Sequence, residues 1–473
     1  MADAKHAKTN VFQILVGFSI FLGFLTLLLF LAIPTNFNAV WHCAGIVDLR
    51  VDAKSAQSSF GGCDGGSLLG VSLDLIDGGG LTEQSINSLS LWPPGLSLIE
   101  SFILLTNGLG VPIAIYLAVL VSLAFATVFV FSMSGFPKKY RVLAGLLLVA
   151  MAFSSPIEGW ILGTGLMYQE GFATAFFMFS LVLVASISSK AATKKRLTLA
   201  IGAGVCLGFA AYFRSIFDPI ILFGLLFSIS LFALNAFKHL VKSHSKTNWQ
   251  SNKFLYSSII FLCAVITMLP WRIFLGNSVH SGNYSWTVAG SNIWASRWYT
   301  NEILDNQGLK PWREGGLNAA CQAYPDKCKE IERLEMSSPY PYTGSGHFSQ
   351  SEFRSMLINE YLTNPLAIIS YKFDVFKSFW LLHNSENYLG RQRPFEGIAY
   401  FFVFISSLAV SIVRFKKHPE LSIIWLSTVL IHLLVLSIYH LEARYLIPLK
   451  LGAILFLVSS LTHYLHKANS IEP

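Results

Sequence analysis

Charged residues are scarce in this chain. Only 13% of its 473 residues are Asp, Glu, Lys or Arg, whereas 53% are hydrophobic. A soluble domain carries roughly a quarter charged residues. This composition excludes an ordinary soluble protein and indicates a membrane protein, for which lipid is the natural solvent.

Several signatures of soluble enzymes and metalloproteins are also missing. The sequence has no phosphate-cradling glycine loop and no cluster of His, Cys, Asp and Glu with the spacing of a zinc site. His432 stands alone within an apolar run, and we expect it to be a hydrogen-bonded interior residue. Two cysteine pairs, Cys43 with Cys63 and Cys321 with Cys328, fall in predicted outer loops. Each pair is a candidate disulfide on an oxidising face, and without geometry the pairing stays open.

Long apolar runs are what the sequence has in abundance. A helix rises about 1.5 Å per residue, so about 20 apolar residues are needed to cross a hydrocarbon core about 30 Å thick. The candidate spans are 11–33, 112–134, 142–155, 170–188, 197–212, 216–236, 254–270, 398–413, 420–438 and 446–463. Of these, 142–155 and 197–212 are interrupted by Gly or end at polar residues. We predict an all-α membrane protein with about 10 to 12 transmembrane helices, interfacial helices and extracytoplasmic loops.

Basic residues predict the orientation, because Lys and Arg concentrate in cytoplasmic loops. They cluster near both termini and at 138–141, 190–196, 238–253 and 414–417. With these clusters in the cytoplasm, the spans alternate without conflict and residues 34–95, 277–365 and 382–397 lie on the opposite face. The net charge of +8 then needs no nucleic acid partner, since membrane lipids and the topology account for it.

The loops divide the chain into three regions. Residues 1–276 form an N-terminal transmembrane region that includes the first outer loop, 34–95. Residues 277–365 form a large outer loop rich in aromatic side chains. Residues 366–473 begin with aromatic and basic residues at helical spacing, which predicts an interfacial helix before the C-terminal spans. A further span is the competing interpretation of that stretch.

Ionisable residues gather on the predicted outer face. Charges near a membrane are costly, so they are functional candidates. On this face they are Asp48, Asp52, Asp74, Asp77, Glu158, Glu170, Arg214, Asp218, Arg272, Glu442 and Arg444. Acids and bases from distant parts of the chain thus meet one membrane face, as an active site at the lipid boundary requires.

Some of these residues also have a purely structural interpretation. Asp74 and Asp77 precede a glycine run, which favours a role as turn formers. Arg272 at a helix end can snorkel to water. Arg214 and Asp218 are four positions apart and can pair with each other.

Short segments carry a family resemblance through their order along the chain. They are Asp48 followed by Ala56, WPPG with Pro93 and Pro94, MYQEGF with Glu170, YFRSIFDP with Arg214, LPWRIF with Arg272, the stretch 353–380, and EARYLIPL with Arg444. In this order, over nearly the whole chain, they resemble the GT-C superfamily of polyprenyl-phosphate-sugar-dependent glycosyltransferases. That group includes protein O-mannosyltransferases and the bacterial aminoarabinose transferase.

The chain also departs from the pattern of that superfamily. The first loop lacks the Asp-Glu pair that many members have and carries Asp48-Leu49 and Asp52 instead. Arg272 directly follows Trp271, without the usual Arg-Asn ending. The choice of catalytic carboxylate between Asp48 and Asp52 therefore stays open.

The resemblance implies transfer of a sugar from a polyprenyl-phosphate donor to a glycan, lipid or protein acceptor. Its catalytic candidates are Asp48, Asp52 and Glu170, of which a loop-one Asp is the general base. Arginine suits a donor phosphate because its planar fork matches phosphate oxygens, and the donor-binding candidates are Arg214, Arg272, Lys372 and Arg444. The substrate-binding candidates are Glu158, Trp294, Trp298 and Tyr445. Use of a divalent cation stays open, because members of the superfamily differ.

Other functions remain as alternatives. A polysaccharide polymerase or ligase of the outer leaflet also uses lipid-linked sugars and large outer loops. A flippase or other transporter has a similar number of helices, but its charges lie near mid-membrane and its halves repeat. A non-catalytic assembly subunit is the third alternative. The topology predicts a multi-pass protein. A bacterial inner membrane, with the active site facing the periplasm, is favoured partly because the outer loops contain only one glycosylation sequon, Asn283-Tyr284-Ser285.

Overall fold

The structure is a computed structural model. Apart from a few isolated positions, it describes residues 64–82, 92–106, 169–187, 192–242, 254–278, 394–415, 419–438 and 446–468. Within these ranges the chain is helical and contains no strand. The helices are α3 (Asp64–Asp77), α5 (Gly95–Leu105), α9 (Glu170–Ala185), α10 (Thr193–Phe213), α11 (Phe217–Lys242), α12 (Leu255–Ser278), α18 (Pro394–Arg414), α19 (Pro419–Ile438) and α20 (Ile447–Ala468).

Seven of the predicted spans are helices in the structure. Four of these helices, α10, α11, α12 and α18, are long and apolar enough to cross a membrane. The other three, α9, α19 and α20, contain shorter apolar stretches within the described residues. The chain is therefore a helical membrane protein. The remaining candidate spans, 11–33, 112–134 and 142–155, lie almost entirely outside the described residues, so the count of 10 to 12 stays a prediction.

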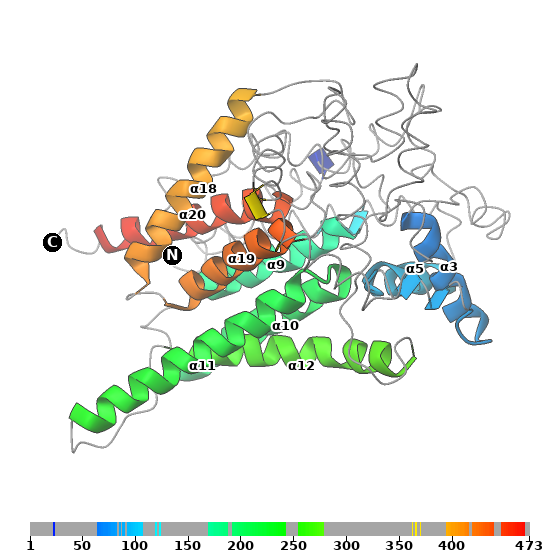
Figure 1. Cartoon of the computed structure of the whole chain (residues 1–473), viewed down its shortest axis with the longest axis horizontal. Helices are drawn as coiled ribbons and strands as arrows, with labels where there is room; N and C mark the ends of the chain where they lie inside the picture. The colour runs from blue at the N-terminus through cyan, green and yellow to red at the C-terminus, as the bar shows by residue number, and fades with distance from the viewer. Residues whose placement is uncertain are drawn as a thin grey trace, which may run out of the picture.

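The long helices pack side by side, and the α3–α5 pair lies at one end of the bundle (Figure 1). Helix α10 lies between α9 and α12, while α11 packs against α12 and α19. Helix α20 packs against α9 and α18. The end that holds the α10–α11 connection, residues 214–216, is the one that the predicted topology puts outside the cytoplasm. We refer to it as the outer end.

Glycines allow α10 and α12 to approach very closely. A Cβ atom added to Gly204 would lie 2.3 Å from the carbonyl oxygen of Ile260, and one added to Gly208 would lie 2.5 Å from Cβ of Thr267. Membrane helices associate through such small residues four positions apart, because apolar burial gives them no driving force in lipid. The glycines that interrupt the predicted span 197–212 are therefore its packing surface.

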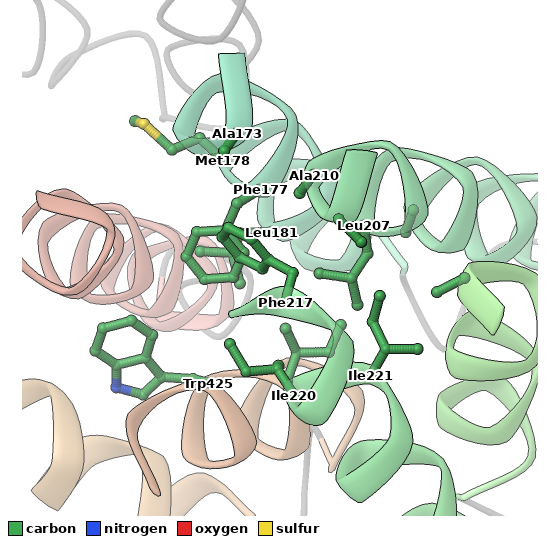
Figure 2. Close-up of a cluster of buried hydrophobic side chains, with 14 of the residues drawn as sticks. Ala173, Phe177, Met178, Leu181, Leu207, Ala210, Phe217, Ile220, Ile221 and Trp425 are labelled. Carbon is green, nitrogen blue, oxygen red and sulfur yellow. The ribbon is translucent and has the colours of Figure 1, made fainter. Parts of the chain in front are cut away.

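Aromatic side chains fill the centre of the bundle (Figure 2). Phe217, in the first turn of α11, is fully buried and lies 5.4 Å from Phe177 of α9, measured between ring centroids. Trp425 of α19 stacks on Phe456 of α20 at 5.9 Å, and its indole nitrogen donates a hydrogen bond to Ser407. Packing of this kind supplies the dispersion energy that holds membrane helices together.

The first outer loop contains helical structure that the sequence analysis did not predict. Helix α3 includes Asp74 and Asp77, so these residues lie in a helix rather than in a turn. The helix ends at Asp77, and Gly78 follows with a φ of 67°, the left-handed conformation common after a helix C-terminus. Asp74 still stabilises the following turn, because its carboxylate accepts hydrogen bonds from the amide and hydroxyl of Thr82 at 2.8 and 2.6 Å.

The glycine contact between α10 and α12 gives a testable prediction. We expect Gly204→Ala to lower the free energy of unfolding by about 1–3 kcal/mol, because the added methyl group meets helix backbone. The control is Gly202→Ala, whose added methyl group would have only an ordinary contact of 3.5 Å with Leu183. Thermal unfolding of the purified protein in detergent compares the two variants, and equal stability would contradict the close approach.

Candidate functional site

The connection between α10 and α11 positions two predicted site residues at the outer end. Helix α10 ends at Phe213, and Arg214 follows in an extended conformation. Helix α11 begins at Phe217, with Asp218 in its first turn, where a carboxylate is favoured by the helix dipole. Asp218 forms an ion pair with Arg272 of α12. An acid and a base that are distant in sequence therefore meet at the outer end.

The Asp218–Arg272 pair is almost completely enclosed. The side chains are 1% and 4% exposed, respectively. Taking two charges out of water is expensive, and the cost is offset only when the charges contact each other closely. Arg272 therefore does not snorkel to water, and that interpretation is wrong. Charges buried near a span end are typical of functional sites in membrane proteins.

The α3–α5 pair docks against the same place. Trp271, next to Arg272, packs in a small cluster with Val71 of α3, and Tyr212 lies against this cluster. Gly95, after the Pro-Pro pair, touches the end of α10 so closely that an added Cβ atom would lie 2.6 Å from the carbonyl oxygen of Tyr212. The segments WPPG, YFRSIFDP and LPWRIF thus lie together, although they are far apart in sequence.

Helix α9 brings the described part of MYQEGF, residues 169–172, to this end of the bundle. The rings of Phe172 and Phe213 stack at a centroid distance of 5.1 Å. Glu170 is the first residue of α9, and the structure describes its backbone only. Gln169 precedes it and is 2% exposed, with no hydrogen-bond partner for its amide among the described residues. The N-terminus of α9 therefore adds a buried polar group beside the α10–α11 connection.

Most of the other predicted site residues cannot be placed. Outside the described residues lie Asp48, Asp52, Glu158, Trp294, Trp298, Lys372, Arg444 and Tyr445. The four outer-loop cysteines also lie there, whereas Cys206 and Cys263 are free thiols in α10 and α12. The proposed roles of the eight residues, and both candidate disulfides, stay predictions.

The structure adds buried ionisable groups that the sequence analysis missed. Lys450 is 2% exposed and lies in the first turn of α20. Glu100 is fully buried in α5. The sequence could have indicated both residues, because each is the single charged residue of a largely apolar stretch. Lys450 lies in IPLKLGAILF and Glu100 in GLSLIESFILL. Such residues are rare in membrane proteins and are functional candidates by the same argument as the others.

Glu100 belongs to a polar seam between α3 and α5. The Ser72 hydroxyl lies 2.7 Å from Oε2 of Glu100, and the Ser97 hydroxyl donates to the carbonyl of Leu68 at 2.8 Å. Helix α5 has 11 residues and a length of about 16 Å, which is too short to span a membrane. Burial raises the pKa of Glu100 to about 8, although the Ser72 hydrogen bond acts in the opposite direction.

The pKa of Asp74, near the end of α3, is lowered, in contrast to that of Glu100. Burial acts to raise its pKa, but hydrogen bonds from Ser85 and Thr82 outweigh burial and lower the pKa below its ordinary value. Asp74 is therefore ionised and committed to the turn that follows α3. This structural task makes it a poor candidate for a general base.

His432 is a buried residue in contact with the helix backbone, as expected. Its Nδ1 lies 2.9 Å from the carbonyl oxygen of Thr428 in the preceding turn of α19, and its ring meets Phe217 edge-on. Among the described residues, no group of three or more His, Cys, Asp and Glu side chains could hold a metal ion. Metal use stays open, because Asp48 and Asp52 are not among those residues.

No protein-family model, curated protein or solved structure matches this chain. The observation that carries most weight is the meeting of four separated segments at the outer end, around a buried Asp–Arg pair.

The ion pair gives a second prediction. Asp218→Asn and Arg272→Gln should each cost about 3–5 kcal/mol of stability, because each leaves the other charge buried without its partner. The double variant should cost clearly less than the sum of the two, since it leaves no uncompensated charge. Unfolding in mixed micelles measures this coupling, and additive costs would show that the two side chains do not stabilise each other.

Glu100 gives a third prediction. The folded state holds the Glu100 proton up to about pH 8, whereas the unfolded chain loses it near the ordinary value of 4.5. The stability of the wild type should therefore fall as pH rises from about 5 to 8. We expect Glu100→Gln to remove this loss. The melting temperature of the variant minus that of the wild type should therefore be larger at pH 8 than at pH 5.

The control for this measurement is Asp77→Asn, which changes an exposed carboxyl group on the neighbouring helix. Because the Asp77 side chain is exposed, this variant should not reproduce the effect that we expect for Glu100→Gln. A difference between Glu100→Gln and the wild type that does not change with pH would contradict a buried, protonated carboxyl group.

Proposed function

We propose that this chain is a membrane glycosyltransferase. It would move a sugar from a polyprenyl-phosphate donor to an acceptor on the extracytoplasmic face of the membrane. The single observation that supports this proposal is the convergence of WPPG, MYQEGF, YFRSIFDP and LPWRIF at one end of the helix bundle. These are the segments that carry the resemblance to the GT-C superfamily, and a shared site is what such an enzyme needs from them.

The position of the buried charges favours an enzyme over a transporter. Arg214 and Asp218 lie at helix ends, and Arg272, which pairs with Asp218, lies near the end of the apolar span Leu255–Phe274. A transporter binds its substrate near mid-membrane, between broken helices of its repeated halves. A donor whose lipid tail stays in the bilayer presents its phosphate and sugar at the headgroup level. Charges at the helix ends suit such a donor.

In the proposed reaction, one bond to the anomeric carbon of the sugar forms and another breaks. An acceptor hydroxyl oxygen bonds to the anomeric carbon of the sugar, while the bond from that carbon to the phosphate oxygen of the donor breaks. The hydroxyl proton passes to a loop-one carboxylate, Asp48 or Asp52, which acts as general base. The polyprenyl phosphate leaves with the bonding electrons, and arginine stabilises its charge.

The two described arginines would contact the donor phosphate in different ways. Arg214 follows the last turn of α10 and is half-buried, so its guanidinium group is the described candidate for contact with a phosphate. Arg272 is already paired with Asp218, and a donor phosphate would share this cation with the carboxylate. Lys372 and Arg444 remain donor-binding candidates from the resemblance. Glu170 would orient the acceptor or the sugar hydroxyls from the start of α9.

The test of the proposal is sugar transfer in reconstituted membranes. Purified protein receives a radiolabelled polyprenyl-phosphate sugar together with an extract of cell-surface glycans and lipid acceptors. We expect Asp48→Asn or Asp52→Asn to reduce transfer by about 10²-fold or more, because the general base is lost. The matched control, Asp77→Asn, removes an exposed carboxylate from the same loop and should keep full transfer. Wild-type turnover by both test variants would reject the assignment of the base.

A further inference from the structure

A second polar site lies at the opposite end of the bundle. A small, partly open pocket is formed by the C-terminal ends of α9 and α18, the N-terminus of α19 and the second half of α20. Its polar lining consists of Arg414, Glu420, Ser422, Ser459 and Ser460. This end carries the basic clusters that predict the cytoplasmic side. The pocket is therefore separate from the candidate active site and faces the other leaflet.

Arg414 provides the positive charge of the pocket. It is the last residue of α18 and is half-buried, and its Nη1 donates a hydrogen bond of 2.7 Å to the carbonyl oxygen of Ser460. This bond holds the guanidinium group at the pocket wall. A guanidinium group has five N–H donors in a planar fork that fits the oxygens of a phosphate. The charge is thus fixed in place by the fold.

Two buried hydroxyl groups in the lining lack an acceptor. Ser422 and Ser460 are 1% and 5% exposed, and neither hydroxyl has a hydrogen-bond partner among the described residues. Elsewhere in the bundle, Ser186, Ser258 and Thr428 donate to the carbonyl four residues earlier, whereas other buried serines, among them Ser180 and Ser228, also have no partner among the described residues. Ser422 lies in the first turn of α19, and the residue four positions earlier, 418, precedes the helix and lies outside the described residues. An acceptor in the pocket would satisfy both hydroxyls.

The remaining groups also favour an anion. The first turn of α19 presents backbone N–H groups without intrahelical partners, and its dipole attracts negative charge. Glu420 is the one acidic residue of the lining; it lies near the positive charge of Arg196 and forms no ion pair with Arg414 among the described residues. Arg196 is itself held over the ring of Tyr256, 4.1 Å from the centroid. The guanidinium group of Arg414 is therefore available to a second anion.

We propose that this pocket binds the phosphate of a phospholipid headgroup from the leaflet at this end of the bundle. Arg414, the Ser422 and Ser460 hydroxyls and the N-terminus of α19 would hold the phosphate oxygens. The pocket is small and partly open, so only the phosphate group would enter it. The acyl chains would remain outside, against the apolar helix surface. A lipid is the expected source because the helix ends lie at headgroup level, where phosphates are concentrated.

Native mass spectrometry of the full chain tests the proposal. The protein is released from detergent in the presence of short-chain phosphatidylglycerol, and the lipid-bound fraction is measured. Arg414→Gln should weaken binding about tenfold or more, the factor expected when a hydrogen-bonded charge is lost. Arg414→Lys should recover only part of it, because the fork is missing. Ser460→Ala should weaken binding less than Arg414→Gln.

The matched control is Lys195→Gln, which removes an exposed positive charge from the same end of the bundle. It should bind the lipid as the wild type does. An equal loss in Lys195→Gln and Arg414→Gln would mean general attraction to basic residues and would overturn the proposal. A parallel titration with inorganic phosphate separates the two sources of the anion: Arg414-dependent binding of phosphate without binding of the lipid would also overturn it.

Discussion

The close contact of α10 with α12 is the constraint on which the rest of the arrangement depends. At Gly204 and Gly208 the two backbones approach so closely that no side chain fits between them. Two helices in such contact cannot slide past each other without a clash, so their register is fixed. That register brings Arg272, near the end of α12, level with Asp218 at the start of α11. The glycine contact thereby supports the buried ion pair, which also depends on how α11 packs against α12.

The two ends of the bundle then differ in chemistry. The outer end has a buried carboxylate and guanidinium group in direct contact, covered by the α3–α5 pair. The opposite end has the half-buried Arg414 and two unsatisfied serine hydroxyls in an open pocket. Between them the core is apolar and aromatic, built around Phe217 and Trp425 (Figure 2). Polar groups at both ends of an apolar middle suit a protein that contacts headgroups in two leaflets.

The sequence predicted the long helices well and the polar contacts less well. A span is specified by its own length and hydrophobicity, so seven predicted runs are helices, including 197–212 with its glycines. Helices α3 and α5 were missed because they are short and because Gly and Ser are frequent around them. The sequence offered Arg214 as the partner of Asp218, whereas the structure pairs Asp218 with Arg272, since the partner depends on how α11 packs against α12. The same holds for the burial of Glu100 and Lys450.

The central claim is that the separated segments at the outer end form one binding site for a lipid-borne phosphate. A photoreactive polyprenyl phosphate, cross-linked to the wild-type protein in membranes and mapped by peptide mass spectrometry, tests this most directly. The account predicts labelling within 212–219 and 269–274 that excess unlabelled polyprenyl phosphate abolishes. Labelling confined to the opposite end of the bundle, or labelling that the competitor does not reduce, would contradict it.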